Sequence, residues 1–78
     1  MRINIDREAL AARLSPLDTD ARRQAYRDGK FPRADKVKDL NVRYRWDLFY
    51  AARPYDLIPD GFTDARIETA LRKIIPPL

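Results

Sequence analysis

The sequence predicts an all-α protein, a small four-helix domain packed around a central helix at about residues 36–52. Three observations support this prediction. Apolar residues recur at helical spacing on two sides of residues 36–52. Three further segments begin with residues that cap helices and end at glycine or proline. The chain has 78 residues, which is enough for one domain, residues 1–78, and for no second one.

The central helix carries two apolar stripes on nearly opposite sides. One stripe contains Val37, Leu40, Tyr44, Leu48 and Ala51, and the other contains Val42, Trp46 and Phe49. A helix that is apolar on both sides needs cover on both sides, from its own chain or from a partner. Two alternatives follow: the other helices wrap it completely and make Trp46 ordinary core, or the second stripe faces a partner or a second copy. Arg45 lies between the stripes, so we expect it to reach solvent or to pair with a carboxylate.

The first helix is predicted over residues 7–14. Asp6 is placed to cap its N-terminus, and Leu10 and Leu14 share one face because they are four residues apart. Pro16 ends the helix, since the residue before a proline avoids the helical region.

The second helix is short, and its start is ambiguous. It begins either at the Ser-Pro pair 15–16 or at residues 18–19, because both carry residues that favour a helix N-terminus. It runs to about Asp28, and Gly29 is the left-handed residue that stops it.

The last two helices have clearer ends. Asp35 is expected to cap the third helix, 36–52, which Pro54 terminates, and Thr63 is expected to cap the fourth. The fourth helix carries an apolar stripe of Ile67, Ala70, Leu71 and Ile74. Two surface ion pairs are predicted from their i, i+4 spacing, Arg43–Asp47 and Glu68–Arg72.

The positive charge is concentrated in the middle of the chain. The net charge is +4, but residues 21–53 hold ten basic side chains against four acidic ones, a local excess of +6. Such an excess favours binding to a polyanion or to an acidic protein surface. The alternative is that these arginines and lysines only keep the surface solvated.

The sequence lacks the usual equipment of an enzyme. It contains no histidine and no cysteine, so the commonest general bases and nucleophiles are missing. Ser15 is the only serine, and helix capping explains its place before a proline. We therefore expect no enzymatic activity and no cofactor.

A metal site and a membrane span are also not expected. Asp56 and Asp60 flank the loop before the fourth helix, but two loop aspartates without a third ligand are a weak metal signal. No apolar run approaches the roughly 20 residues that span a bilayer. The first residues lack the apolar segment of a signal peptide, so a cytoplasmic location is expected.

Two groups of residues are the candidate partner-binding sites. The basic candidates are Arg22, Arg23, Arg27, Lys30, Arg33, Lys36 and Lys38, and the aromatic candidates are Trp46 and Phe49. Aromatic and arginine side chains dominate the energetics of protein interfaces, whereas the basic residues alone suit nucleic-acid phosphates. A protein partner is the first hypothesis, nucleic acid is the second, and self-association stays open.

Two segments of the chain resemble small proteins encoded by tailed bacteriophages and prophages. The segments are Lys38-Asp39-Leu40-Asn41-Val42-Arg43-Tyr44-Arg45-Trp46-Asp47-Leu48 and Thr63-Asp64-Ala65-Arg66-Ile67-Glu68-Thr69-Ala70-Leu71-Arg72-Lys73-Ile74. The resemblance covers the C-terminal half of the chain and implies a phage origin. It carries over no catalytic residue, because no activity is associated with the group.

The resemblance also shapes the expected role. Phage proteins of this size without catalytic groups often occlude a host machine such as an RNA polymerase, a nuclease or a CRISPR surveillance complex. By this analogy we expect a binding protein that modulates or inhibits such a machine sterically, in the cytoplasm of the host bacterium.

Overall fold

The computed structural model describes residues 4–78, and these residues form four α-helices. The helices are α1 (Arg7–Leu14), α2 (Asp20–Arg27), α3 (Leu40–Ala52) and α4 (Asp64–Ile74). Short 3-10 turns lie between them at Ser15–Leu17, Ala34–Lys36 and Tyr55–Leu57, and no strand occurs within residues 4–78. The all-α prediction is confirmed.

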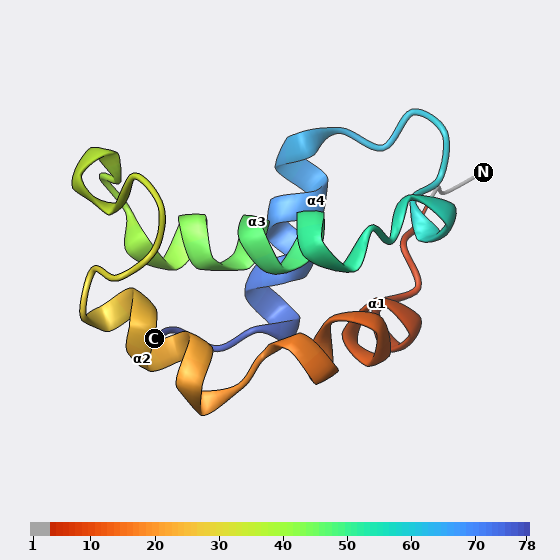
Figure 1. Cartoon of the computed structure of the whole chain (residues 1–78). Coiled ribbons are helices and arrows are strands. Elements are labelled where there is room, and N and C mark those ends of the chain that lie inside the picture. The colour runs from red at the N-terminus through yellow and green to blue at the C-terminus, as the bar shows by residue number, and fades with distance from the viewer. Residues whose placement is uncertain (1–3) are drawn as a thin grey trace.

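The central position of α3 is also as predicted. It contacts α1, α2, α4 and the 3-10 turn at Ser15–Leu17. Figure 1 shows α3 running across the molecule, with α4 crossing it and α1 and α2 following its lower side. The C-terminus lies beside α2 in the same view. The molecule is elongated, with dimensions of 43 × 23 × 18 Å.

Most of the predicted helix ends are confirmed. The side chains of Asp6 and Thr63 each accept a hydrogen bond from the amide three residues on, at 3.1 and 3.3 Å. Of the two predicted starts for the second helix, the structure uses the later one, with Thr19 as the cap. Gly29 follows that helix with a φ of 69°, and Arg53 ends α3 with a φ of 50°.

The predicted start of the third helix is wrong by four residues. Asp35 lies in a 3-10 turn, and α3 begins at Leu40. Asp39 is the actual cap, because its Oδ1 accepts from the amides of Asn41 and Val42 at 3.1 and 3.2 Å. An aspartate that pairs two amides of the first turn outcompetes one four residues earlier.

The core forms where α1, α3 and α4 meet. Its buried hydrophobic residues are Leu10, Leu14, Tyr26, Tyr44, Leu48, Phe49, Ile67, Ala70, Leu71 and Ile75. The predicted faces of α1 and α4 are therefore confirmed, apart from Ile74, which is only partly buried. On α3 the first stripe is buried at its centre, whereas Ala51 is exposed and Ala52 packs against the core instead.

Arg45 does neither of the two things predicted for it. It is only 7% exposed, and its Nε donates a hydrogen bond of 3.0 Å to the carbonyl oxygen of Ile75. Ile75 is the C-cap residue of α4, where helix carbonyls lack partners within the helix and attract cations. The buried guanidinium thus ties α3 to the end of α4.

Candidate interaction surface

The second stripe of α3 is divided between core and surface. Phe49 is 2% exposed and belongs to the core, while Trp46 and Val42 are partly buried. Neither predicted alternative holds for the whole stripe. The chain covers Phe49 itself and leaves the tryptophan at the edge of the core.

Two tyrosines extend this edge into solvent. Tyr50 on α3 is 56% exposed, and Tyr55 in the following 3-10 turn is 57% exposed. The ring of Trp46 lies 5.6 Å from that of Tyr50, and the buried Phe49 contacts the rings of Trp46 and Tyr55 at 5.4 and 5.8 Å. We call Trp46, Tyr50 and Tyr55 the aromatic face.

The aromatic face is larger than the sequence analysis predicted. Trp46 was a candidate, but Tyr50 and Tyr55 were not counted among the binding residues. Tyr50 lies four residues after Trp46, so helical spacing already places it beside the tryptophan. Tyr55 is brought there by the turn after Arg53, which the pattern of α3 does not encode.

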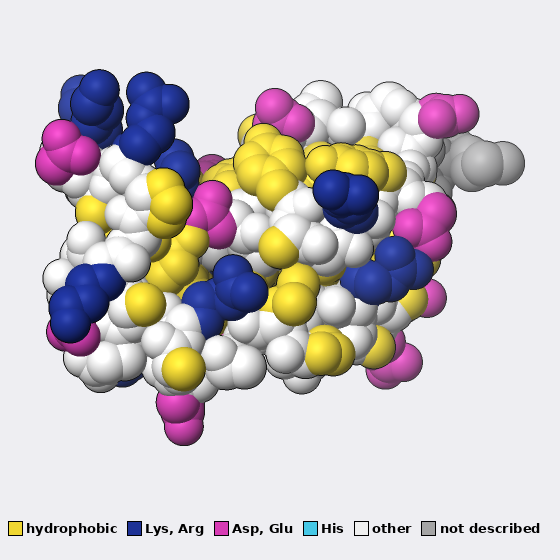
Figure 2. Space-filling view, in the orientation of Figure 1, with side chains coloured by type: hydrophobic (Ala, Val, Ile, Leu, Met, Phe, Trp, Pro, Cys, Tyr) yellow, Lys and Arg dark blue, Asp and Glu magenta, His cyan; other side chains and the backbone are white. Residues whose placement is uncertain are grey.

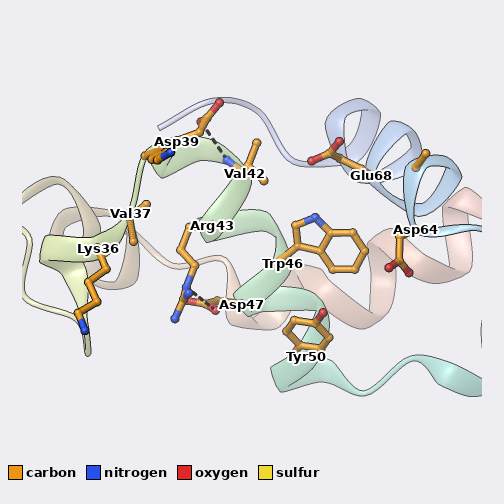
Figure 3. Close-up of a pocket in the computed structure, with 12 residues that line it drawn as sticks. Lys36, Val37, Asp39, Val42, Arg43, Trp46, Asp47, Tyr50, Asp64 and Glu68 are labelled. Carbon is orange, nitrogen blue, oxygen red and sulfur yellow. Dashed lines mark hydrogen bonds and ion pairs between the residues drawn. The ribbon is translucent and has the colours of Figure 1, made fainter.

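A groove of about 690 Å³ opens between α3 and α4 beside Trp46. Figure 3 shows the Trp46 ring projecting from α3 toward α4, with Tyr50 beneath it and Asp64 and Glu68 beyond it. Lys36 and Arg43 lie at the other end of the same groove. Asp39 and Asp47 line that end as well, so the groove has an aromatic middle, an end of mixed charge and an acidic end.

A second hollow of about 410 Å³ adjoins the first. Its lining consists of Trp46, Phe49, Tyr50, Tyr55, Ile58, Pro59, Asp60, Gly61, Asp64 and Ile67. We call it the aromatic cleft. Trp46, Tyr50 and Asp64 line both hollows, so the two form one continuous recess. The charged residues that line the cleft, Asp60 and Asp64, are both acidic.

Five predicted basic residues are exposed and close together in the chain. They are Arg27, Lys30, Arg33, Lys36 and Lys38. None of them forms an ion pair with another residue of the described range 4–78. Figure 2 shows basic side chains gathered at the end of the molecule that carries the connection from α2 to α3. Arg22 is half-buried on α2.

Arg23 does not belong to this open basic group, contrary to the prediction. Its Nε and Nη2 donate to the two carboxylate oxygens of Asp18 at 2.8 and 3.0 Å. It also donates to the carbonyl oxygens of Pro76 and Pro77, at 3.2 and 3.0 Å. Tyr44 donates a further hydrogen bond to Asp18. Arg23 thus joins α2 to the C-terminal segment.

The carboxylate of Asp18 is stabilised in its charged form by these contacts. The hydrogen bonds from Arg23, and then that from Tyr44, hold the pKa of Asp18 below its ordinary value, although partial burial opposes them. Burial, together with the hydrogen bond to this carboxylate, raises the pKa of the Tyr44 hydroxyl. The cluster is therefore a structural tie between helices.

Tyr26 is likewise structural. It is buried, its hydroxyl donates to Asp47, and its ring stacks on Phe31 with centroids 4.1 Å apart. Asp47 also receives the predicted ion pair from Arg43, with 3.1 Å between Nε and Oδ1. The other predicted pair, Glu68–Arg72, is present at 3.5 Å. Tyr26 is therefore closed to stacking on a ligand, whereas Tyr50 is open to it.

No three acidic, histidine or cysteine residues of the described range 4–78 come together in a way that would hold a metal ion. None of its helices has the length and apolar character that crossing a membrane requires. Comparison of the chain with protein-family models, with curated proteins and with solved structures found no match.

Proposed function

We propose that this is a non-enzymatic binding protein that contacts another protein through its aromatic face. The partly buried Trp46 beside the exposed Tyr50, with the exposed Tyr55 lining the same cleft, supports this proposal most strongly. Tyrosine and tryptophan are enriched among the residues that dominate protein interfaces, because they bury a large area with few rotatable bonds. An exposed tyrosine pair next to a half-buried tryptophan supplies such anchors.

The charge around the aromatic face favours a protein over a nucleic acid. Asp64 and Glu68 form the acidic end of the groove, and Asp60 lies in the adjoining cleft. A phosphate backbone laid across the aromatic rings would meet these carboxylates and be repelled. A protein surface offers both signs of charge and can match the acidic end and the mixed-charge end of the groove together.

The proposal includes the biological role that the phage resemblance suggests. The protein has 78 residues, and its proposed contact surface is one recess. Such a small protein acts most simply by binding over a surface that its partner needs for function. We propose that the partner is a component of a host or phage machine, such as a polymerase, a nuclease or a CRISPR complex, and that the result is steric inhibition.

The test is a binding measurement with a paired control. The affinity-tagged protein is used to isolate a partner from the host bacterium, and the dissociation constant for the purified partner is then measured. The Tyr50→Ala/Tyr55→Ala double variant is expected to weaken binding at least about tenfold, a typical loss for interface anchors. The Lys30→Ala/Arg33→Ala double variant is expected to stay within about threefold of the parent. The opposite ranking would contradict the proposal.

A second candidate function is nucleic-acid binding, which is favoured by the five exposed basic residues that form no ion pair within residues 4–78. It predicts binding to random-sequence duplex DNA, with an affinity that falls steeply as salt rises. Under this alternative the Lys30→Ala/Arg33→Ala variant loses affinity and salt dependence, while the tyrosine variant keeps both. Absence of duplex binding at low salt would eliminate it.

A further inference from the structure

We infer that the aromatic cleft receives an arginine or lysine side chain of the protein partner. This inference rests on the proposed function and deepens it, because it names the chemical group that the cleft recognises. The cleft combines aromatic walls with carboxylates, and no basic residue among residues 4–78 belongs to its lining. That combination is specific for a cation.

The aromatic walls are the first argument. A cation near the face of a tryptophan or tyrosine ring is attracted by the ring quadrupole, and tryptophan attracts it most strongly. Trp46, Tyr50 and Tyr55 all line the cleft, and the planes of the first two are tilted by 31° to one another. The long apolar stem of an arginine or lysine side chain suits such walls as well as its charged end does.

The carboxylates are the second argument. Asp60 and Asp64 are exposed, and neither forms an ion pair with another residue of the described range. Asp64 also opens α4, where a negative charge suits the helix dipole, but that role leaves its carboxylate open to an outside cation. Figure 2 shows the apolar surface over α3 and the start of α4, with acidic side chains above it and a basic one below.

The molecule's own arginines do not take this role within the described range. Arginine–ring contacts occur at Tyr44, under Arg23, and at Phe62, under Arg66, with 5.2 and 4.7 Å to the ring centroids. Both of those rings lie outside the lining of the cleft. Neither of these arginine contacts therefore occupies a ring that lines the cleft.

A second copy of the chain is the less favourable source of that cation. Each copy carries a net charge of +4, so long-range repulsion opposes the approach of two copies. A partner with a lower net charge and one protruding basic side chain meets no such barrier. The carboxylates also argue against a phosphate or carboxylate group as the occupant.

The experiment uses the single tryptophan as the reporter. The full chain is titrated with acetyl-Gly-Arg-Gly-amide and, separately, with acetyl-Gly-Gln-Gly-amide, while Trp46 fluorescence and its indole N–H resonance are followed. The arginine peptide is expected to shift both signals with a dissociation constant of the order of 1 mM, and the glutamine peptide is expected to leave them unchanged. Equal shifts from the two peptides, or none from either, would overturn the inference.

Two variants with the same net charge separate a local effect from a general one. Asp60→Asn/Asp64→Asn is expected to weaken binding of the arginine peptide about fivefold. Asp20→Asn/Asp35→Asn, which changes two exposed aspartates outside the cleft, is expected to have no effect beyond about 1.5-fold. Equal weakening in both variants would overturn the inference, because it would reflect overall charge. A dimer in light scattering that Asp60→Asn/Asp64→Asn abolishes would also overturn it, because the occupant would be a second copy.

Binding to the purified partner distinguishes this inference from the function on which it rests. Loss of partner binding in Tyr50→Ala/Tyr55→Ala and also in Asp60→Asn/Asp64→Asn supports both. Loss in the tyrosine variant alone overturns the basic side chain as the occupant and leaves the proposed function intact. No loss in either variant overturns the proposed function, and the peptide titration then decides by itself whether the cleft binds a cation.

Discussion

The two sides of α3 differ in how the protein covers them. On one side Tyr44 and Leu48 are almost completely inaccessible to solvent and pack against the rest of the core. On the other side Trp46 is only partly covered, and Tyr50 is more than half exposed. The same helix thus serves as the centre of the core and as a surface with uncovered aromatic rings.

The buried side is also secured by polar contacts. Arg45 bonds to the end of α4, and Arg23 bonds to Asp18 and to the carbonyls of the C-terminal prolines. The contacts with the carbonyl oxygens of residues 75–77 join segments between 30 and 54 residues apart. On the open side Trp46 contacts Tyr50, and the ring of Tyr55 contacts the buried Phe49. Substitutions on the two sides should therefore affect different properties of the protein.

The largest expected effect is on the buried side. Leu48→Ala removes a side chain that is 0% exposed, and we expect it to lower the free energy of unfolding by about 2–5 kcal/mol, near the whole stability of a domain this small. Leu71→Ala, at 0% exposure on α4, should cost a similar amount. Thermal melts followed by circular dichroism measure both. Melting curves equal to the parent's would show that the core lies elsewhere.

The next largest effect is a difference in stability loss between substitutions of two arginines that lie four residues apart on α2. Arg23→Ala leaves Asp18 without its ion pair in a site where both side chains are at most one-fifth exposed, and we expect a loss of about 2–3 kcal/mol. Arg27→Ala changes an exposed side chain and should stay within about 0.5 kcal/mol of the parent. Urea unfolding measures both. A loss in Arg23→Ala as small as that expected for Arg27→Ala would mean that the Arg23 contacts contribute no net stability.

The sequence predicted most helix ends because they depend on local chemistry. Asp6, Thr63 and Gly29 act within one turn of their own positions, so a single-sequence pattern was enough. The cap of the third helix was predicted wrongly, as Asp35, whereas Asp39 caps it. Both aspartates precede an apolar helical pattern, so that pattern alone does not distinguish them.

The site was predicted only in part, because exposure depends on contacts distant in the sequence. The pattern identified Trp46, but only the folded chain shows that Phe49 is buried and that Tyr55 joins the aromatic face. Arg23 was predicted to belong to the basic surface, and Arg45 to reach solvent or to pair with a carboxylate. Both instead donate to carbonyl oxygens of residues 75–77, Arg23 in addition to its pair with Asp18, and a carbonyl gives no signal in a sequence.

A third test uses the pH dependence of stability to measure what the Asp18 carboxylate contributes on the buried side. The pKa of Asp18 is lowered in the folded state, so its contribution is complete above the pKa of the unfolded chain, near 4, and is lost as pH falls through the folded value. Unfolding free energy should therefore rise between about pH 2 and pH 5. Asp18→Asn should flatten this rise and cost about 1–2 kcal/mol at pH 7.

The control for that titration is Asp56→Asn. Asp56 also has a lowered pKa, because Arg13 donates two hydrogen bonds to it, but both side chains are well exposed. We expect Asp56→Asn to flatten the rise of the unfolding free energy at acid pH less than Asp18→Asn does, since solvent weakens an exposed ion pair. A larger change in Asp56→Asn would show that the contact between α1 and the 3-10 turn at Tyr55–Leu57 is the stronger tie.

The smallest stability effects are expected on the open side. Tyr50→Ala and Tyr55→Ala each remove a ring that is more than half exposed, so each should change the unfolding free energy by less than about 1 kcal/mol. Iodide should quench Trp46 only partly in the parent and more strongly in Tyr50→Ala, because Tyr50 screens one side of the indole. A loss above about 2 kcal/mol in either variant would place that tyrosine in the core. It would also remove the reason for the aromatic face to need a partner.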